Sequence, residues 1–142
     1  MDAAQPKQKI AIVEDNIALA DIYKTRLELL GYQCFTANDG IAALYLIEKE
    51  QPDLVLLDLM VPKIAGDEIL AKMRASEWGK SIPVYVISNL NEVDAPEGIR
   101  KMGIVGYSVK AVMVNNMLDK IVNSILRPEQ SSHDPTLHNQ PL

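Results

Sequence analysis

Several features that would indicate particular protein classes are missing from this chain of 142 residues. Its one cysteine, Cys34, excludes an internal disulfide and a metal site made of several cysteines. No stretch approaches the roughly 20 apolar residues of a membrane-spanning helix, and residues 1–7 lack the apolar core of a signal peptide. There is no basic cluster and the formal net charge is −5, which argues against nucleic acid as a direct partner. We therefore expect a cytoplasmic protein without membrane insertion.

The sequence does contain enough apolar residues for one core, arranged with two alternating periods. Short Val- and Leu-rich runs are typical of strands, and longer segments with apolar residues three to four apart are typical of helices. We expect strands at 9–14, 32–37, 54–57, 82–88 and 104–109, and helices at 17–30, 38–51, 66–77, 95–102 and 112–126. Short connections between them favour right-handed crossovers and a parallel sheet covered on both faces. The predicted fold class is α/β, with a doubly wound five-stranded parallel sheet in the order 2-1-3-4-5 and five flanking helices.

The composition also suggests where the folded domain begins and ends. We expect an N-terminal extension at 1–7, a single domain at 8–126 and a polar tail at 127–142. The tail has almost no apolar residues, so we expect it to be disordered.

Asp58 is the residue that indicates chemistry most directly. It follows the apolar run Leu54–Leu57 and precedes another apolar stretch. A carboxylate buried there without a partner would be costly, so such a residue needs a counter-charge, a metal or a chemical task. Asp58 stands where the expected strand ends, and in open parallel sheets ligands and catalytic groups collect at this edge.

Other polar residues follow neighbouring strands at the same edge. Glu14 and Asp15 end the first expected strand, Ser88 ends the fourth, and Lys110 follows the fifth. Carboxylates gathered there repel one another by roughly 4 kcal/mol for a pair about 4 Å apart at an effective dielectric of about 20. Lys110 relieves part of this repulsion, and a small oxygen-only site with open water positions favours Mg²⁺ for the rest. A metal beside a carboxylate, a lysine and a hydroxyl suits the acceptance of a phosphoryl group by the carboxylate.

Each of these residues also has a plainer interpretation. Glu14 and Asp15 can stabilise a helix N-terminus, where acidic residues are favoured. Ser88 can be an ordinary hydroxyl at a strand end, and Lys110 a solvated lysine. A tyrosine such as Tyr107 in the last strand is commonly a packing residue. The functional interpretation depends on the coincidence that four separate strand ends carry suitable chemistry.

The chain carries a set of motifs that is specific when taken together. They are the acidic pair Glu14-Asp15, Asp58 with Pro62 and Gly66 following it, Ile82-Pro83-Val84 leading to Ser88, and Gly106-Tyr107-x-x-Lys110. With them the chain resembles the receiver domain of two-component response regulators, and among these the chemotaxis-type single-domain receivers, which have a flavodoxin-like fold. The resemblance covers residues 8 to about 126.

The resemblance implies an acceptor and a metal site. Asp58 would be the phosphoacceptor, taking the group from a histidine of a sensor kinase or a phosphotransfer protein. Asp15, Asp58 and the backbone carbonyl of Met60 would hold Mg²⁺, or another divalent cation such as Mn²⁺ or Ca²⁺. Glu14 would act on the metal mostly through water.

The resemblance also implies a switch. Lys110 would pair with the bound phosphoryl group, and Ser88 would hydrogen-bond it. Tyr107 would then move inward and alter the face made by the strand at 104–109 and the helices on either side of it. Adding a dianionic group beside fixed donors biases a two-state element in this way.

Three positions depart from the usual family pattern. Ala111 replaces the proline that commonly follows the lysine, often with a cis bond. A non-proline cis bond costs about 2.5–4 kcal/mol, so either the site holds this strain or the bond is trans, which we favour. Met60 and Leu90 are apolar, and our hypothesis is that they screen the phosphoryl group from water and lengthen its lifetime.

We therefore expect a phosphorylation-dependent response regulator, a monomer or a weak dimer through the switch face, that signals to a downstream protein and is not an enzyme. A degenerate receiver acting as a scaffold would have lost the acceptor, an acid or the lysine, and none is lost. The chain can also be the receiver part of a longer regulator. An aspartyl-phosphate hydrolase would need an acid where Met60 stands, and a flavin site would need a phosphate-binding loop where Glu14-Asp15-Asn16 stands.

Overall fold

The computed structural model describes residues 6–113 and 116–128. The chain divides into two compact units, Met1–Val112 and Met113–Leu142, and each is described separately. The first unit contains the sheet and every predicted site residue. Most of the expected extension at 1–7 and of the expected tail at 127–142 lies outside the described residues, so these domain limits stay predictions.

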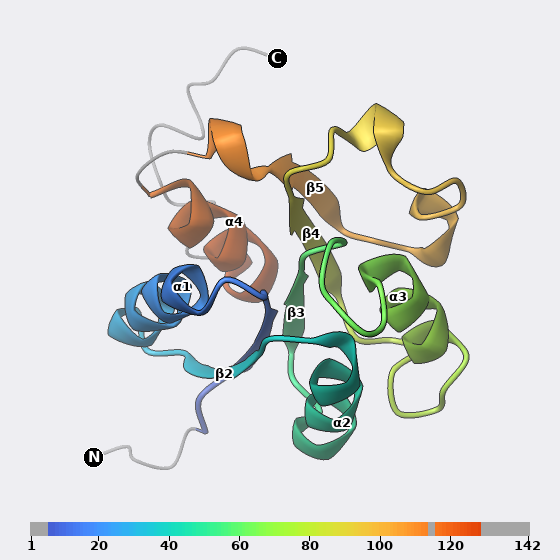
Figure 1. Ribbon diagram of the computed structural model, residues 1–142. Coiled ribbons are helices and arrows are strands. Elements are labelled where there is room, and N and C mark those ends of the chain that lie inside the picture. Colours follow the sequence, from blue (N-terminus) through green and yellow to red (C-terminus); the bar gives the residue numbers. More distant parts are fainter. Residues whose placement is uncertain (1–5, 114–115, 129–142) are drawn as a thin grey trace. The chain divides into compact units, whose positions relative to one another are not determined.

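The sheet of the first unit has five parallel strands in the predicted order, β2-β1-β3-β4-β5 (Figure 1). The strands are β1 (Lys9–Val13), β2 (Gln33–Ala37), β3 (Leu54–Leu57), β4 (Val84–Ser88) and β5 (Gly106–Val109). The register places Val13 beside Leu57, and Ser88 beside Val109. Residues that follow these strands therefore emerge together at the carboxyl edge.

Helices cover both faces of the sheet. In the first unit, α1 (Ile17–Leu29) lies on one face, and α2 (Gly40–Glu50) and α3 (Gly66–Arg74) lie on the other (Figure 1). Side chains alternate between faces along a strand, so every second residue of β1, β3 and β4 joins the core beneath α2 and α3. The strand members of that cluster are Ala11, Val13, Val55, Leu57, Val84 and Val86. Burying an aliphatic side chain contributes roughly 1.5–3 kcal/mol, which holds the strand ends in place.

The N-terminus of α1 is capped by Asn16. Its side-chain oxygen accepts the N–H of Leu19 at 3.0 Å. This satisfies one of the first free N–H groups of the helix. The capping position is therefore occupied by neither Glu14 nor Asp15, and both acids are available at the edge of the sheet.

The predicted helix at 95–102 is wrong, and the described residues contain four α-helices instead of five. The segment forms two single 3-10 turns, Glu92–Asp94 and Arg100–Met102. Gly98 lies between them with φ of 88°, in the left-handed region that interrupts an α-helix. Few residues remain on either side, and so short a helix is unstable unless it buries an apolar face.

The last helix, α4 (Met117–Leu126), belongs to the second unit and is shorter than the predicted 112–126. Lys110–Val112 forms a 3-10 turn at the end of the first unit. The expected switch face includes residues of both units and stays a prediction. No helix among residues 6–113 and 116–128 is long and apolar enough to cross a membrane.

Candidate functional site

Three polar side chains are buried among the described residues, and all three belong to the predicted site. Glu14 is 2% exposed, Asp58 is 4% exposed and Ser88 is fully buried. Each lies at the carboxyl end of a strand: Glu14 after β1, Asp58 after β3 and Ser88 at the end of β4. A buried polar group requires hydrogen-bond partners, so the contacts of these three residues define the site.

Both oxygens of Asp58 are held by donors. Oδ1 accepts the backbone N–H of Met60 at 3.0 Å and the hydroxyl of Ser88, also at 3.0 Å. Oδ2 accepts from the ammonium of Lys110 at 2.7 Å. The carboxylate therefore has a fixed orientation at the end of β3, with donors supplied by three different segments.

Lys110 bridges two buried acids. Its Nζ lies 2.6 Å from Glu14 Oε1 and 2.7 Å from Asp58 Oδ2. Burial by itself would lower the pKa of Lys110, but the two carboxylates prevail and the pKa is raised. The lysine is therefore charged at neutral pH. Burial raises the pKa of Glu14, although Lys110 and the N–H of Asn16 act in the opposite direction.

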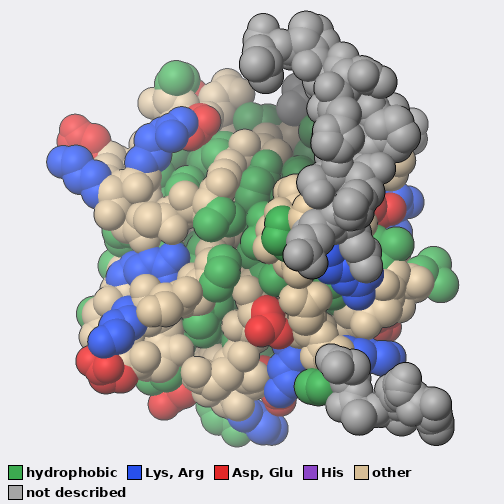
Figure 2. Space-filling model, turned by 180° about the vertical axis from the view of Figure 1, so that it is seen from behind, with side chains coloured by type: hydrophobic (Ala, Val, Ile, Leu, Met, Phe, Trp, Pro, Cys, Tyr) green, Lys and Arg blue, Asp and Glu red, His purple; other side chains and the backbone are tan. Residues whose placement is uncertain are grey.

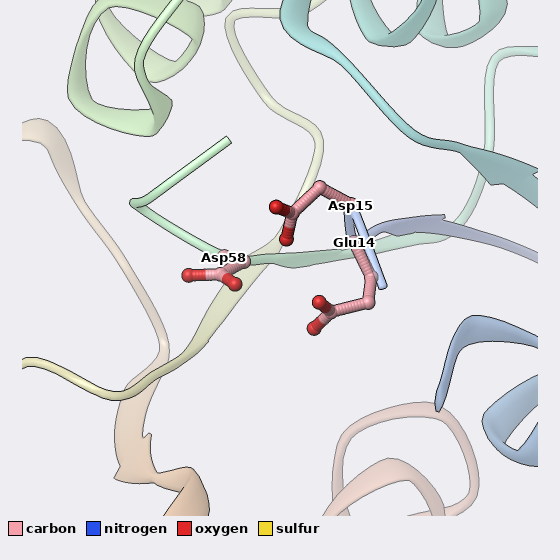
Figure 3. Close-up of side chains that lie close together, drawn as sticks. All are labelled: Glu14, Asp15 and Asp58. Carbon is pink, nitrogen blue, oxygen red and sulfur yellow. The ribbon is translucent and has the colours of Figure 1, made fainter. Parts of the chain in front are cut away.

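Glu14, Asp15 and Asp58 gather around a common space. Each offers a carboxylate oxygen, and these oxygens all lie within 4.8 Å of one another. Figure 3 shows the three side chains turned toward the same region from the ends of β1 and β3. Three carboxylates and one ammonium leave a formal charge of −2.

This set of ligands fits a hard divalent cation. All the donors are oxygen atoms, as Mg²⁺, Mn²⁺ and Ca²⁺ prefer. Asp15 is exposed, so water can reach the remaining coordination positions. The residues present therefore agree with the metal that the sequence predicts.

Tyr107 does not contact the acceptor, and its link to the site is indirect. Its hydroxyl donates to the carbonyl of Leu90 at 2.8 Å. The N–H of Leu90 lies 3.4 Å from Ser88 Oγ. Burial raises the pKa of Tyr107, so the hydroxyl keeps the proton that it donates. Tyr107 thus fixes the segment that follows Ser88.

Gly66 has a packing role that the sequence analysis did not assign. A Cβ at this position would lie 2.5 Å from Leu59 Cα and 2.6 Å from the carbonyl oxygen of Asp58. The N–H of Gly66 donates to Leu59 O at 3.0 Å. The start of α3 therefore presses on the backbone of the acceptor. The spacing of Gly66 from Asp58 was the signal available in the sequence.

Asn38 is a second supporting residue that the sequence analysis missed. Its side-chain amide donates to the carbonyl of Glu14 at 2.8 Å. Because Asn38 follows β2 as Glu14 follows β1, its place in the register was the available signal.

The peptide bond between Lys110 and Ala111 is trans, as predicted. Lys110 nevertheless reaches both carboxylates, so the geometry of this site does not require the proline that Ala111 replaces.

Two curated relatives match most of the chain. The DNA-binding dual master transcriptional regulator RpaA of Synechocystis is 34% identical over 140 residues, which are 94% of this chain and 57% of RpaA. Sporulation initiation phosphotransferase F of Bacillus subtilis is 31% identical over 114 residues, which are 80% of this chain and 90% of that protein. The chain spans about half the length of RpaA and of the similar ycf27 transcriptional regulators, 42% to 57% of each.

Solved structures with the same fold include two with a metal ion. The receiver domain of sensor histidine kinase PA1611 from Pseudomonas aeruginosa, with magnesium coordinated in its active-site cleft, has a TM-score of 0.75 and 26% identity. The match covers 85% of this chain and 98% of that domain. The Mn²⁺-bound form of response regulator Rcp1 has a TM-score of 0.70 and 27% identity, covering 85% and 94%.

The family model named response regulator receiver domain matches residues 10–122. That range contains all five strands and every residue of the site described above. The chain therefore belongs to the response regulator receiver domain family.

Proposed function

We propose that this chain is a phosphorylation-dependent receiver in which Asp58 accepts a phosphoryl group from a phosphohistidine of a kinase or phosphotransfer protein. One observation carries the proposal. The carboxylate of Asp58 is buried, held by Ser88, Lys110 and the N–H of Met60, and set beside two further acids. A buried carboxylate with this many donors is a pre-oriented nucleophile.

The transfer itself makes one bond and breaks one. A carboxylate oxygen of Asp58 attacks phosphorus as the bond between phosphorus and the donor's imidazole nitrogen breaks. The electron pair of the broken bond returns to that nitrogen. Both oxygens of Asp58 already accept hydrogen bonds, so at least one contact of Ser88, Met60 or Lys110 moves as the donor approaches.

Two side chains of the site can follow the charge that moves onto the phosphoryl oxygens. Lys110 Nζ and Ser88 Oγ lie at 2.7 Å and 3.0 Å from Asp58 oxygens. Charge-assisted donors of this kind are strong and need little reorganisation. Glu14 holds the lysine from the other side, which keeps its ammonium at the acceptor.

Glu14, Asp15 and Asp58 would hold a divalent cation, and the resemblance adds the backbone carbonyl of Met60 as a further ligand. When bound, such an ion neutralises charge on the transferring oxygens. The magnesium and manganese in similar receivers support this assignment.

The signal would leave the site through Ser88, Leu90 and Tyr107. A phosphoryl group that takes the Ser88 hydroxyl shifts the segment carrying Leu90, whose carbonyl holds the Tyr107 hydroxyl. The face around β5 would then change its affinity for a downstream protein or for a second copy of the chain. Direct binding of nucleic acid is not part of the proposal for these residues.

Met60 and Leu90 would set the lifetime of the phosphoryl group. The side chain of Met60 is 54% exposed beside the acceptor, and Leu90 is half-buried beyond Ser88. We expect Met60→Asn and Leu90→Glu to speed dephosphorylation, measured as loss of the phosphorylated mass after the donor is removed. Unchanged rates in both variants would disprove the screening.

The test of the function is incubation with acetyl phosphate and Mg²⁺, followed by intact-mass measurement. The unmodified chain should gain one phosphoryl unit, and Asp58→Ala should gain none. Asp21→Ala, which removes an exposed acid on α1, should gain as much as the unmodified chain. Modification of Asp58→Ala, or no modification of any form, would contradict the proposal and favour a phosphorylation-independent scaffold.

A further inference from the structure

A second concave site lies at the opposite end of β4 and β5 from the acceptor. A cavity of about 500 Å³ opens between the end of α3, the residues before β4 and the residues before β5. Its walls include Arg74, Lys80, Lys101, Ile82, Pro83 and Val105, three basic and three apolar residues. The volume lies in the range of roughly 300–1,000 Å³ that is usual for small-molecule sites.

Arg74 brings to this cavity a charge that no acid balances. Its guanidinium donates to four backbone carbonyls and to no carboxylate; the distances are 2.7 Å to Met102, 3.0 Å to Gly79, 2.9 Å to Ile82 and 3.3 Å to Gly103. Burial alone lowers the pKa of Arg74, with no contribution from an acidic neighbour. A guanidinium has five N–H donors, so one N–H remains for a ligand.

The two lysines of the cavity are also weakly compensated. Lys80 pairs with Glu77 at 2.9 Å, but the Glu77 side chain is 91% exposed, and such pairs contribute little. Lys101 has no ion pair or side-chain hydrogen bond among the residues that the structure describes. No acidic residue lines the cavity, although the chain as a whole carries a net charge of −5. The space-filling view likewise shows basic side chains beside apolar ones on one face of the molecule (Figure 2).

We propose that this cavity binds a small phosphate-bearing molecule of nucleotide size. Arginine and lysine together are the usual partners of phosphate oxygens. Pro83 and the half-exposed Val105 offer apolar surface for a ring. The site is separate from the acceptor, and its ligand takes no part in phosphoryl transfer.

Occupation of the cavity would restrain the connection between β4 and β5. The ligand would join Arg74 at the end of α3 to Lys101 in the 3-10 turn Arg100–Met102. That connection contains single turns in place of a helix, so it has few hydrogen bonds of its own. Amide exchange in residues 99–105 should therefore slow when the ligand binds.

The experiment is an NMR titration of the chain with ADP in EDTA, without Mg²⁺ or phosphodonor. We expect saturable shifts confined to residues 74–83 and 101–105, and no binding of adenosine, which lacks phosphate. Lys101→Ala and Lys80→Ala should each weaken ADP binding at least tenfold. Lys72→Ala is the matched control, because Lys72 lies on α3 but pairs with Glu68 and does not line the cavity.

Other outcomes would overturn the proposal. They are shifts that do not saturate, equal affinity for adenosine, equal ADP affinity in Lys101→Ala, or binding of an acidic peptide in place of ADP. Asp58→Ala should bind ADP as the unmodified chain does. Loss of ADP binding in Asp58→Ala would place the nucleotide at the acceptor, and the cavity would then have no ligand.

Discussion

The ammonium of Lys110 makes two short contacts with buried acids, and its own side chain is 14% exposed. Ion pairs of this kind differ from those on the surface because neither acid can turn to water when its partner is lost. At residue scale, the stability of the site therefore depends on Lys110 more than on any surface pair. The sequence supported this role only by position, since a lysine in isolation is usually solvated.

Replacing Lys110 by Met should destabilise the chain strongly in the absence of divalent metal. It leaves Glu14 and Asp58 buried without a counter-charge, and breaking such a pair costs about 3–5 kcal/mol. Urea unfolding in EDTA measures this loss, and Mg²⁺ should recover part of it by replacing the missing charge. Lys72→Met is the control: its pair with Glu68 is exposed, with 4.0 Å between the charged atoms, so its loss should stay within about 0.5 kcal/mol. Equal losses in the two variants would show that Lys110 does not bridge the acids in solution.

Cys34 gives a pH dependence with a defined sign. Burial raises the pKa of its thiol from 9.0 to about 12, so the folded chain keeps the proton while the unfolded chain releases it. The stabilisation is present below pH 9 and is lost as the pH rises from about 9 toward 12. Between pH 8 and pH 10 the unmodified chain should lose about 1.4 kcal/mol more than Cys34→Ala. Equal losses in urea unfolding would mean that the thiol is accessible in the folded chain.

At the scale of elements, α3 and the end of β3 form one unit around the acceptor. Gly66 begins α3 so close to Asp58 and Leu59 that a Cβ would meet backbone atoms at 2.5 Å and 2.6 Å. Backbone atoms cannot turn aside as a flexible side chain can. The position of the nucleophile is therefore set partly by a helix that contributes no side chain to its hydrogen bonds.

Gly66→Ala should slow the phosphorylation of Asp58 and also destabilise the chain. Inserting a methyl group into a packed region costs typically about 1–3 kcal/mol, and the displaced loop carries the N–H of Met60 that holds the carboxylate. Rates with acetyl phosphate and urea unfolding measure the two effects. Ala71→Gly separates them, because it weakens α3 by about 1 kcal/mol at an exposed position away from the acceptor. An equal fall in rate in both variants would mean that stability alone is responsible.

The elements that were predicted correctly are those in which local pattern and tertiary packing agree. The five strands and three helices of the first unit follow from apolar runs, caps such as Asn16 and breaks such as Gly31. The helix at 95–102 failed because a capping pattern beginning at Asp94 was given more weight than Gly98. Such a pattern stabilises a helix only when an apolar face is buried as well, and sequence alone does not show this.

At the scale of the whole molecule, the site residues could be predicted because topology brings strand ends together. Glu14, Asp58 and Ser88 follow from the strand order and the register. The contacts that support them could not be predicted. The approach of Gly66 to Asp58, and the clamp of Arg74 on four carbonyls, depend on loop conformations that no periodic pattern encodes.

Mg²⁺ should stabilise the whole chain, because it binds only where the fold gathers Glu14, Asp15 and Asp58. A ligand at about one hundred times its dissociation constant adds about 2.7 kcal/mol to the free energy of unfolding. Thermal unfolding in MgCl₂ should therefore occur at a higher temperature than in EDTA, and MnCl₂ should act in the same direction. Asp15→Asn is the decisive control, since Asp15 is exposed and its loss should leave the fold in EDTA unchanged while removing most of the metal effect. An equal rise in Asp15→Asn would mean that the ion binds elsewhere, and the three carboxylates would then be a repulsive cluster neutralised by Lys110 alone.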